Sequence, residues 1–249
     1  MQRRNVMNKN ALFGCITFTA LSTFSGITQA QERFKDFTFV GAGVAAEESV
    51  FSVDGAKPGA ALYLFHHSQY GFVDGGLGNV AITPWFGISG NIRLSEVSSD
   101  FRDIPNGIND RDSNGELGVT FGTLGARLTF LHDVTDKHNG YEIQLHLGRI
   151  LETPLDDVFI TPYFEIDYRD KKFSDYLYSV SSSESSASGL AQFQAQETWV
   201  YKGGLIGLYD YSDNLLGISK LELEHHDSDS PLVTNNLGWK FSIGAAYKF

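Results

Sequence analysis

The sequence contains one cysteine, Cys15, only six prolines, and only 19 lysines and arginines among 249 residues. A single cysteine excludes both a disulfide framework and a cysteine-based zinc site. Acidic residues number 30, so the formal net charge is -11. This balance argues against nucleic acid as a partner, since phosphate binding needs clustered Lys and Arg. After the first thirty residues, no stretch approaches the roughly 18 consecutive apolar residues of a transmembrane helix.

Hydrophobic residues make up 42% of the chain and aromatic residues 13%, which argues against intrinsic disorder. Glycine occurs 26 times beside 19 Phe and 11 Tyr, a combination that favours β structure. The length fits one large all-β domain or one α/β domain.

Residues 1–30 have the composition of a secretory signal peptide. Residues 1–10 are basic and polar, Ala11–Ile27 is apolar, and Thr28 and Ala30 place small residues before a cleavage site. We therefore expect the signal peptide 1–30 to be cleaved and the mature domain 31–249 to be exported.

Strict alternation of apolar and polar residues runs through the mature chain. It is clearest at the C-terminus, where every second residue is apolar: Trp239, Phe241, Ile243, Ala245, Tyr247 and Phe249. A period of two predicts a β-strand, and eleven tilted residues match one crossing of a bilayer. In residues 141–148, Leu145 is predicted to face lipid and Gln144 the lumen.

The placement of aromatic and charged residues distinguishes a membrane barrel from a soluble sandwich or a lipocalin-like barrel. Aromatic residues lie near strand ends, as in the two girdles of an outer-membrane barrel: Tyr141, Tyr163, Tyr168, Trp199 and Trp239. Charged residues fall on the opposite face, as expected for a polar lumen: Glu142, Glu165, Asp167, Lys220, Glu222 and Glu224. The fold class predicted is an all-β, transmembrane antiparallel β-barrel.

Loop lengths constrain the number of strands. Predicted strands are 37–45, 59–67, 81–94, 117–122, 126–133, 141–148, 158–168, 199–209, 215–226 and 239–249. Long and short connections alternate, and outer-membrane barrels have long external loops, short periplasmic turns and an even number of strands. We expect 10 strands, or 12 if 70–79 is a strand and another exists, for example within 169–197.

Several segments, in order, resemble the MipA/OmpV outer-membrane proteins (the MltA-interacting protein family). They are Phe72–Gly78, Asp133–Glu142, Ile160–Tyr163, Asp175–Val180, Asp229–Val233 and Phe241–Phe249. The resemblance implies a β-barrel in the outer membrane of a Gram-negative bacterium, surrounded by outer-membrane lipid. The end of the chain at Phe249 also resembles the signal read by the barrel assembly machinery.

The same resemblance implies a function in the cell envelope. The founding member is implicated in tethering a lytic transglycosylase to a murein synthase, as a scaffold in cell-wall maintenance. Other members are linked to adhesion, osmotic response and antibiotic entry. The family has no established catalytic residues, so no catalytic, cofactor-binding or metal-binding residue is predicted from it.

Three chemical candidates are visible in the sequence. Asp110–Gly115 matches the first half of a calcium loop, but position 12 is Phe121 in place of a glutamate, which favours a solvated loop. The pairs His66–His67 and His225–His226 can each offer only one ligand to a shared site, since neighbouring residues of a strand face opposite ways. The serine-rich segment Ser181–Gly189 is expected to be a flexible external loop tip.

We therefore expect a non-enzymatic scaffold that binds envelope proteins. The alternatives are a small cation-preferring diffusion channel with an acidic lumen, an adhesin, or a membrane-embedded lipid hydrolase. A periplasmic partner could reach the turns Thr153–Asp157 and Ser212–Asn214, and the mature N-terminus Gln31–Asp36.

Overall fold

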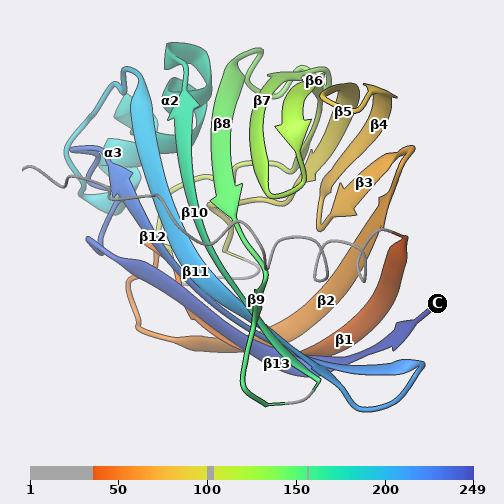
Figure 1. The fold of residues 1–249 in the computed structure, drawn as a ribbon. Helices are drawn as coiled ribbons and strands as arrows, with labels where there is room; N and C mark the ends of the chain where they lie inside the picture. Colours follow the sequence, from red (N-terminus) through yellow and green to blue (C-terminus); the bar gives the residue numbers. More distant parts are fainter. Residues whose placement is uncertain (1–35, 100–103, 156) are drawn as a thin grey trace, which may run out of the picture.

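The computed structural model describes residues 36–99, 104–155 and 157–249, so the predicted signal peptide lies outside the described residues. One antiparallel sheet contains all the strands (Figure 1). They are β1 (Phe37–Glu48), β2 (Lys57–Ser68), β3 (Gly71–Asp74), β4 (Leu77–Thr83), β5 (Phe86–Arg93), β6 (Asn114–Thr123), β7 (Ala126–Asp133), β8 (Tyr141–Gly148), β9 (Leu151–Glu152), β10 (Val158–Arg169), β11 (Thr198–Asp210), β12 (Leu215–Asp227) and β13 (Gly238–Lys248).

The sheet closes on itself as a barrel of 12 strands. The first strand pairs with the last, from Phe39 opposite Lys248 to Glu48 opposite Trp239. The two-residue β9 pairs with β10 on the same side as β8 does. It therefore continues β8 and does not count as a separate strand of the barrel. The prediction of a closed, even-stranded antiparallel barrel is confirmed, with 12 strands as the number.

The expectation of a strand in 70–79 is confirmed, since this segment contains β3 and the beginning of β4, but the second additional strand does not lie within 169–197. The predicted strand 81–94 is divided by a turn at residues 84–85 into the end of β4 and β5, and β3 precedes them. Residues 169–197 contribute no membrane strand and instead contain α2 (Lys171–Tyr178) and α3 (Ser182–Ser188). A four-residue β3 is too short to show a clear alternation, which is why the sequence left the count open. No helix in the described part of the chain is long and apolar enough to cross a membrane.

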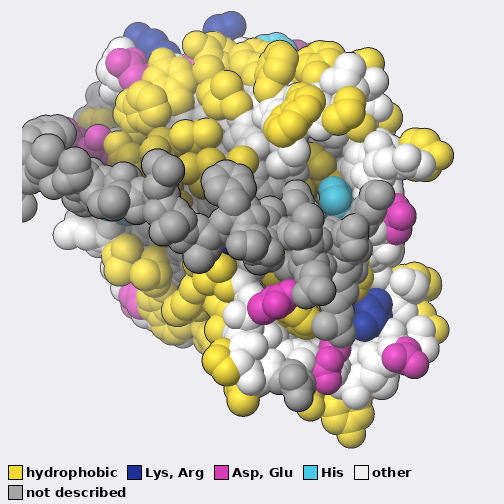
Figure 2. Space-filling view, viewed as in Figure 1, with side chains coloured by type: hydrophobic (Ala, Val, Ile, Leu, Met, Phe, Trp, Pro, Cys, Tyr) yellow, Lys and Arg dark blue, Asp and Glu magenta, His cyan; other side chains and the backbone are white. Residues whose placement is uncertain are grey.

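The outer wall of the barrel is apolar. Exposed side chains on alternate positions include Leu145, Leu147, Trp199, Leu205, Phe241 and Ile243. Figure 2 shows hydrophobic side chains spread over this outer surface. Tyr168 lies between Tyr141 and Trp199, with ring centroids 6.3 and 5.0 Å away, and forms part of an aromatic belt near the external end.

One of the predicted girdle residues faces inward. The Tyr163 hydroxyl donates to Glu222 Oε2 at 2.5 Å, so its ring lies in the lumen. The prediction was wrong because it considered nearness to a strand end without the period-two register, which places Tyr163 on the same face as Glu165 and Asp167.

Candidate functional site: a capped and ion-paired lumen

Four long connections, after β1, β5, β10 and β12, pack together over one end of the barrel (Figure 1). They share an apolar core made of Val50, Phe51, Val97, Ile104, Ile108, Phe173, Leu177, Tyr178, Val180, Ala195 and Leu232. By the loop-length rule this is the external end. The four connections are therefore described together as the external cap, a small folded layer over the lumen.

Helix α2 attaches the cap to the barrel wall. Asp170 caps its N-terminus by accepting from the Phe173 N–H at 3.1 Å, and accepts also from the Tyr141 N–H at 2.9 Å. The Phe173 ring lies 5.0 Å from the Arg93 guanidinium and 4.9 Å from that of Arg169. This buried ring thus makes two cation–π contacts with cations of the barrel wall.

Helix α3 corrects the expectation of a flexible serine-rich tip. Ser181 and Glu184 form a capping box, and Gly189 ends the helix in the left-handed conformation at a φ of 76°. The Glu184 carboxylate also accepts from Arg111 Nη1 at 2.8 Å and from the Asn109 N–H at 3.1 Å. The spacing Ser-x-x-Glu was the sequence signal that could have revealed this helix.

Acidification is expected to loosen the external cap. Burial alone would raise the pKa of Glu184, but hydrogen bonds from Arg111 and Ser181 outweigh it and lower the pKa to about 2. A carboxyl with a depressed folded-state pKa stabilises the fold above its unfolded pKa of about 4.3, and this contribution is lost as the pH falls towards 2. Limited proteolysis of the reconstituted protein should therefore cut within 170–197 more readily at pH 3 than at pH 7.

Glu184→Gln should reproduce this effect at pH 7, with roughly tenfold faster cleavage, because charge-assisted bonds to Arg111 are lost. The exposed neighbour Glu197 is the matched control, and Glu197→Gln should leave the cleavage rate unchanged. Equal cleavage of the wild type at both pH values would contradict the assigned role of Glu184.

Beneath the external cap, five charged side chains from four parts of the chain form one buried network. Arg93 donates to Glu142 Oε1 at 2.6 Å and contacts Glu116 at 3.1 Å. Arg169 donates to Glu142 Oε2 at 2.8 Å and to Glu96 at 2.8 and 3.0 Å. Arg169 is 1% exposed and Glu142 0% exposed, so these charges are compensated within the protein.

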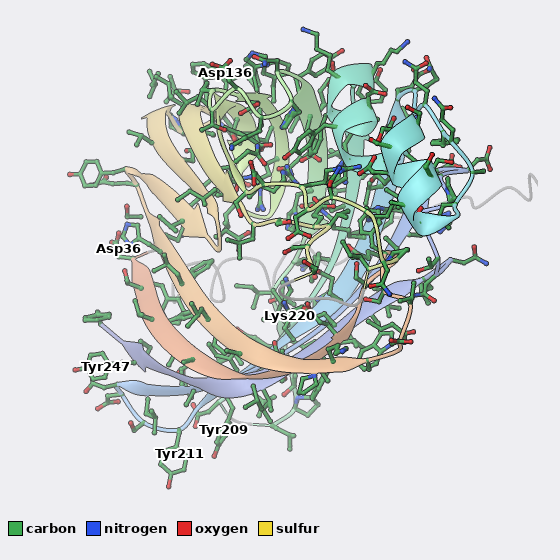
Figure 3. The ribbon with its side chains drawn as sticks, turned by 180° about the vertical axis from the view of Figure 1, so that it is seen from behind. Asp36, Asp136, Tyr209, Tyr211, Lys220 and Tyr247 are labelled. Atoms are coloured by element: carbon green, nitrogen blue, oxygen red, sulfur yellow. The ribbon has the colours of Figure 1, made fainter. Side chains whose placement is uncertain are left out.

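A second charged group continues the network across the lumen. Lys202 Nζ donates to Asp167 at 2.6 Å and to Glu165 at 3.0 Å, and Lys220 Nζ lies 2.9 Å from Glu222. Figure 3 labels Lys220 inside the barrel. The predicted carboxylates do face the lumen, and Lys and Arg side chains pair with several of them there. Towards the other end of the barrel, the inward-facing side chains form an apolar cluster that includes Phe37, Phe39 and Phe159.

Tyr178 joins the external cap to Arg169 and to His226. Its hydroxyl accepts from Arg169 Nη1 at 2.8 Å and lies 2.9 Å from His226 Nδ1. Sequence alternation could have marked Arg93 and Arg169 as inward-facing, as it did Glu142. It carried no signal for Tyr178, which belongs to a helix of the external cap and not to a strand of the wall.

The structure separates the three oxygen ligands of the calcium half-motif. Asp110 accepts from the Ser99 N–H at 2.8 Å, Asp112 pairs with Lys137 at 2.6 Å, and Asn114 donates to Glu116 in the lumen at 3.1 Å. Among the described residues, no group of three His, Cys, Asp or Glu side chains is arranged to hold a metal ion.

Each histidine pair is divided between the two faces of the wall, as expected. His226 is buried against Tyr178, whereas His225 lies outside, stacked on Tyr201 at 6.3 Å. His66 is placed by hydrogen bonds with Thr38 at 2.7 Å and Ser68 at 3.1 Å.

The opposite, periplasmic end consists of short turns and exposed side chains. Tyr211 is 70% exposed beside the turn Ser212–Asn214, and Leu155 is 67% exposed in the turn 153–157. Figure 3 shows Tyr209, Tyr211 and Tyr247 at this end and Asp136 at the other. Both predicted partner-binding turns therefore lie on the same rim of the barrel.

Apolar outer wall, ion-paired lumen and alternating loop lengths together define a β-barrel of the outer membrane. The family model described as MltA-interacting protein MipA matches residues 40–249, and the chain belongs to this family. The predicted resemblance and the predicted location in the outer membrane are thereby confirmed.

Two curated relatives from Escherichia coli (strain K12) are similar to part of the chain. "Putative outer membrane protein YiaT" is 30% identical over 151 residues, covering 57% of this chain and 60% of the relative. "MltA-interacting protein" is 24% identical over 149 residues, covering 57% of this chain and 59% of the relative. The aligned region thus spans about three fifths of each relative's length.

Solved barrels show low similarity. The outer membrane protein OprG from Pseudomonas aeruginosa has 15% identity and a TM-score of 0.30, covering 86% of this chain and 96% of that chain. OmpTdeltaL8, a loop L8 deletion mutant of OmpT from Vibrio cholerae, has 8% identity and a TM-score of 0.36. The match covers 86% of this chain and 99% of that chain.

Proposed function

We propose that this barrel is a non-enzymatic scaffold that binds a lytic transglycosylase at the periplasmic face of the outer membrane. The observation that carries the proposal is the filled lumen: buried ion pairs cross it, and the external cap packs over it. Since such a lumen suits neither a wide pore nor a free active site, the exposed rims are the surfaces left for binding. The name of the relative MltA-interacting protein supports the choice of partner.

The binding surface proposed is the periplasmic rim. It comprises the turns Thr153–Asp157 and Ser212–Asn214, with Gln31–Asp36 at the predicted mature N-terminus. Exposed Tyr211 and Leu155 supply apolar contact area beside the acidic residues. A partner with a basic patch fits this surface, so association should weaken as salt rises.

Charge reversal at this rim is expected to weaken capture of the transglycosylase. The double variant combines Glu152→Lys, directly before the turn Thr153–Asp157, with Asp213→Lys in the second turn; both altered side chains are exposed, so folding should be unaffected. Recovery of the enzyme in a pull-down from solubilised envelopes should fall roughly two- to fivefold at low salt, the size expected of two rim charges.

The matched control reverses two exposed charges in the external loops, Asp54→Lys and Asp229→Lys, and should leave recovery unchanged. Failure to recover either a lytic transglycosylase or a murein synthase at low salt, together with steady single-channel conductance, would overturn the scaffold in favour of the channel. A loss that is equal in both double variants would place the partner elsewhere on the protein.

Three further parts of the proposal concern partners. A murein synthase would join the transglycosylase on the same rim as the second member of the scaffold. The barrel assembly machinery would read β13 together with Phe249, which directly follows the strand and is 73% exposed. Outer-membrane lipid would surround the apolar outer wall.

A further inference from the structure

The barrel wall is incomplete along one seam. β2 pairs with β1 over nearly its whole length, but with β3 over four residue pairs only, Phe65–Ser68 against Gly71–Asp74. The chain turns back at Gly75, whose N–H donates to the Leu64 carbonyl at 3.1 Å in the last bond of this seam. Figure 1 shows β3 as a short arrow beside the long β2. Among the described residues, no strand therefore pairs with this side of β2 between residues 58 and 63.

The antiparallel pairing of β2 shows which of its backbone groups point into this gap. In an antiparallel strand, successive residues direct both of their backbone groups to alternate sides. Since the Leu64 carbonyl bonds towards β3, the N–H and C=O groups of Leu62 and Ala60 also point to the open side. Pro58, two residues further on, has no N–H to leave unpaired, and proline is typical of open strand edges.

The open edge lies within the depth of the membrane. Lys57, at the external end of β2, pairs with Glu47 near the aromatic Trp239. Leu62 lies five residues further along the strand, about 12 Å deeper at a tilt of about 40°. Its side chain is 85% exposed. Because an unpaired backbone group costs several kcal/mol in hydrocarbon, this edge requires a hydrogen-bonding partner from its surroundings.

A second copy of the chain does not fit as that partner. Two barrels related by an axis along the membrane normal would bring their β2 strands together at about 80°, twice the strand tilt. Strands that cross at this angle cannot form a ladder of hydrogen bonds. The partner must therefore be small enough to enter the gap from the lipid.

Tyr63, on the inner face of β2, does not contribute to this edge. Its ring extends across β1 to Gly244 of β13, where a Cβ atom would lie 2.8 Å from Tyr63 Cε2, and so points away from the open side of β2. A ligand at the edge is therefore held by backbone groups alone.

We propose that this edge of β2 binds a membrane amphiphile with one acyl chain and an uncharged head that both donates and accepts hydrogen bonds. The head bonds to the backbone groups of Ala60 and Leu62. The acyl chain lies along the outward-facing Leu62 and Leu64, which are 85% and 48% exposed. The site is distinct from the periplasmic rim proposed for protein partners.

Two proline variants test whether the edge is open in the membrane. Ala60→Pro removes an N–H that points into the gap, so the full chain should fold and retain heat-modifiable migration in detergent gels. Ala61→Pro removes an N–H that pairs with β1 and should sharply lower the amount of folded barrel. If both variants fail to fold equally, the edge is paired and the proposal is overturned.

Photolabelling tests the ligand, using the full chain in liposomes and a diazirine-bearing long-chain alcohol as the probe. Mass spectrometry should find the label on β2 near Leu62. Ala60→Pro, which removes one N–H from the open edge, should lower labelling roughly two- to tenfold, the value of one hydrogen bond. Tyr63→Phe is the control and should leave labelling unchanged, since its hydroxyl points away from the edge. A diazirine alkane of the same length should label this segment no more than the rest of the outer wall. Equal labelling by alcohol and alkane, or labelling unchanged in Ala60→Pro, would show only ordinary lipid contact at this edge and overturn the proposal.

Discussion

Replacement of Arg169 by methionine should lower the free energy of unfolding by about 3–5 kcal/mol, the usual cost of leaving a buried charge without its partner. Arg169 is 1% exposed and bonds to Glu142, Glu96 and Tyr178. Methionine retains much of the side-chain volume, so the loss comes from the charge. The variant should also release the external cap, since Tyr178 belongs to it.

The measurement is the urea dependence of folding into liposomes, with proteolysis of residues 170–197 as a second readout of the cap. Lys172→Met is the matched control, because Lys172 is an exposed cation on α2, and its loss should change stability by no more than about 0.5 kcal/mol. A cost below 1 kcal/mol for Arg169→Met would show that the network contributes little to folding.

A cation placed on the outer face of β8 should destabilise the barrel more than one placed on its inner face. Leu145 is 39% exposed on the outer wall, and Leu145→Arg should cost about 2–4 kcal/mol because it places a charge in lipid near the midplane. Gln144 faces the lumen and donates to Glu142 Oε1 at 2.6 Å, so Gln144→Arg places its charge beside a carboxylate and should be tolerated better.

The same urea titration compares these two variants, which differ by one position along the chain. Each variant is thus the other's control for the effect of a large cationic side chain. If Gln144→Arg were the more damaging of the two, the faces would be exchanged, since a one-residue slip of register reverses every side chain of a strand.

Much of the barrel was predictable because the period of two is a property of the backbone itself. Side chains of an extended chain alternate between faces, so the outward position of Phe241 and the inward position of Glu142 could be read directly. The parity of the strand count followed from alternating loop lengths. β3 could not be read, because four residues are too few to establish a period.

The candidate site was less predictable, and the reasons differ between its parts. Helix α3 had a local signal in Ser181 and Glu184, which serine-rich composition obscured. For the network around Arg169, alternation indicates which side chains face inward but not which of them pair, since the partners Glu96 and Glu142 are 73 and 27 residues away in the chain. Contacts over such separations depend on how strands and loops are brought together.

The sequence by itself therefore determined the outer-membrane barrel, the facing of its strands and its even strand number, because these follow from local alternation and loop length. Only the tertiary structure decided that buried ion pairs and an apolar cluster occupy the lumen, that an external cap covers it, and that β2 has an open edge. These features arise where residues distant in sequence meet or fail to meet. Closure of the barrel determines which strands are neighbours, and this arrangement cannot be predicted from the local alternation of residues.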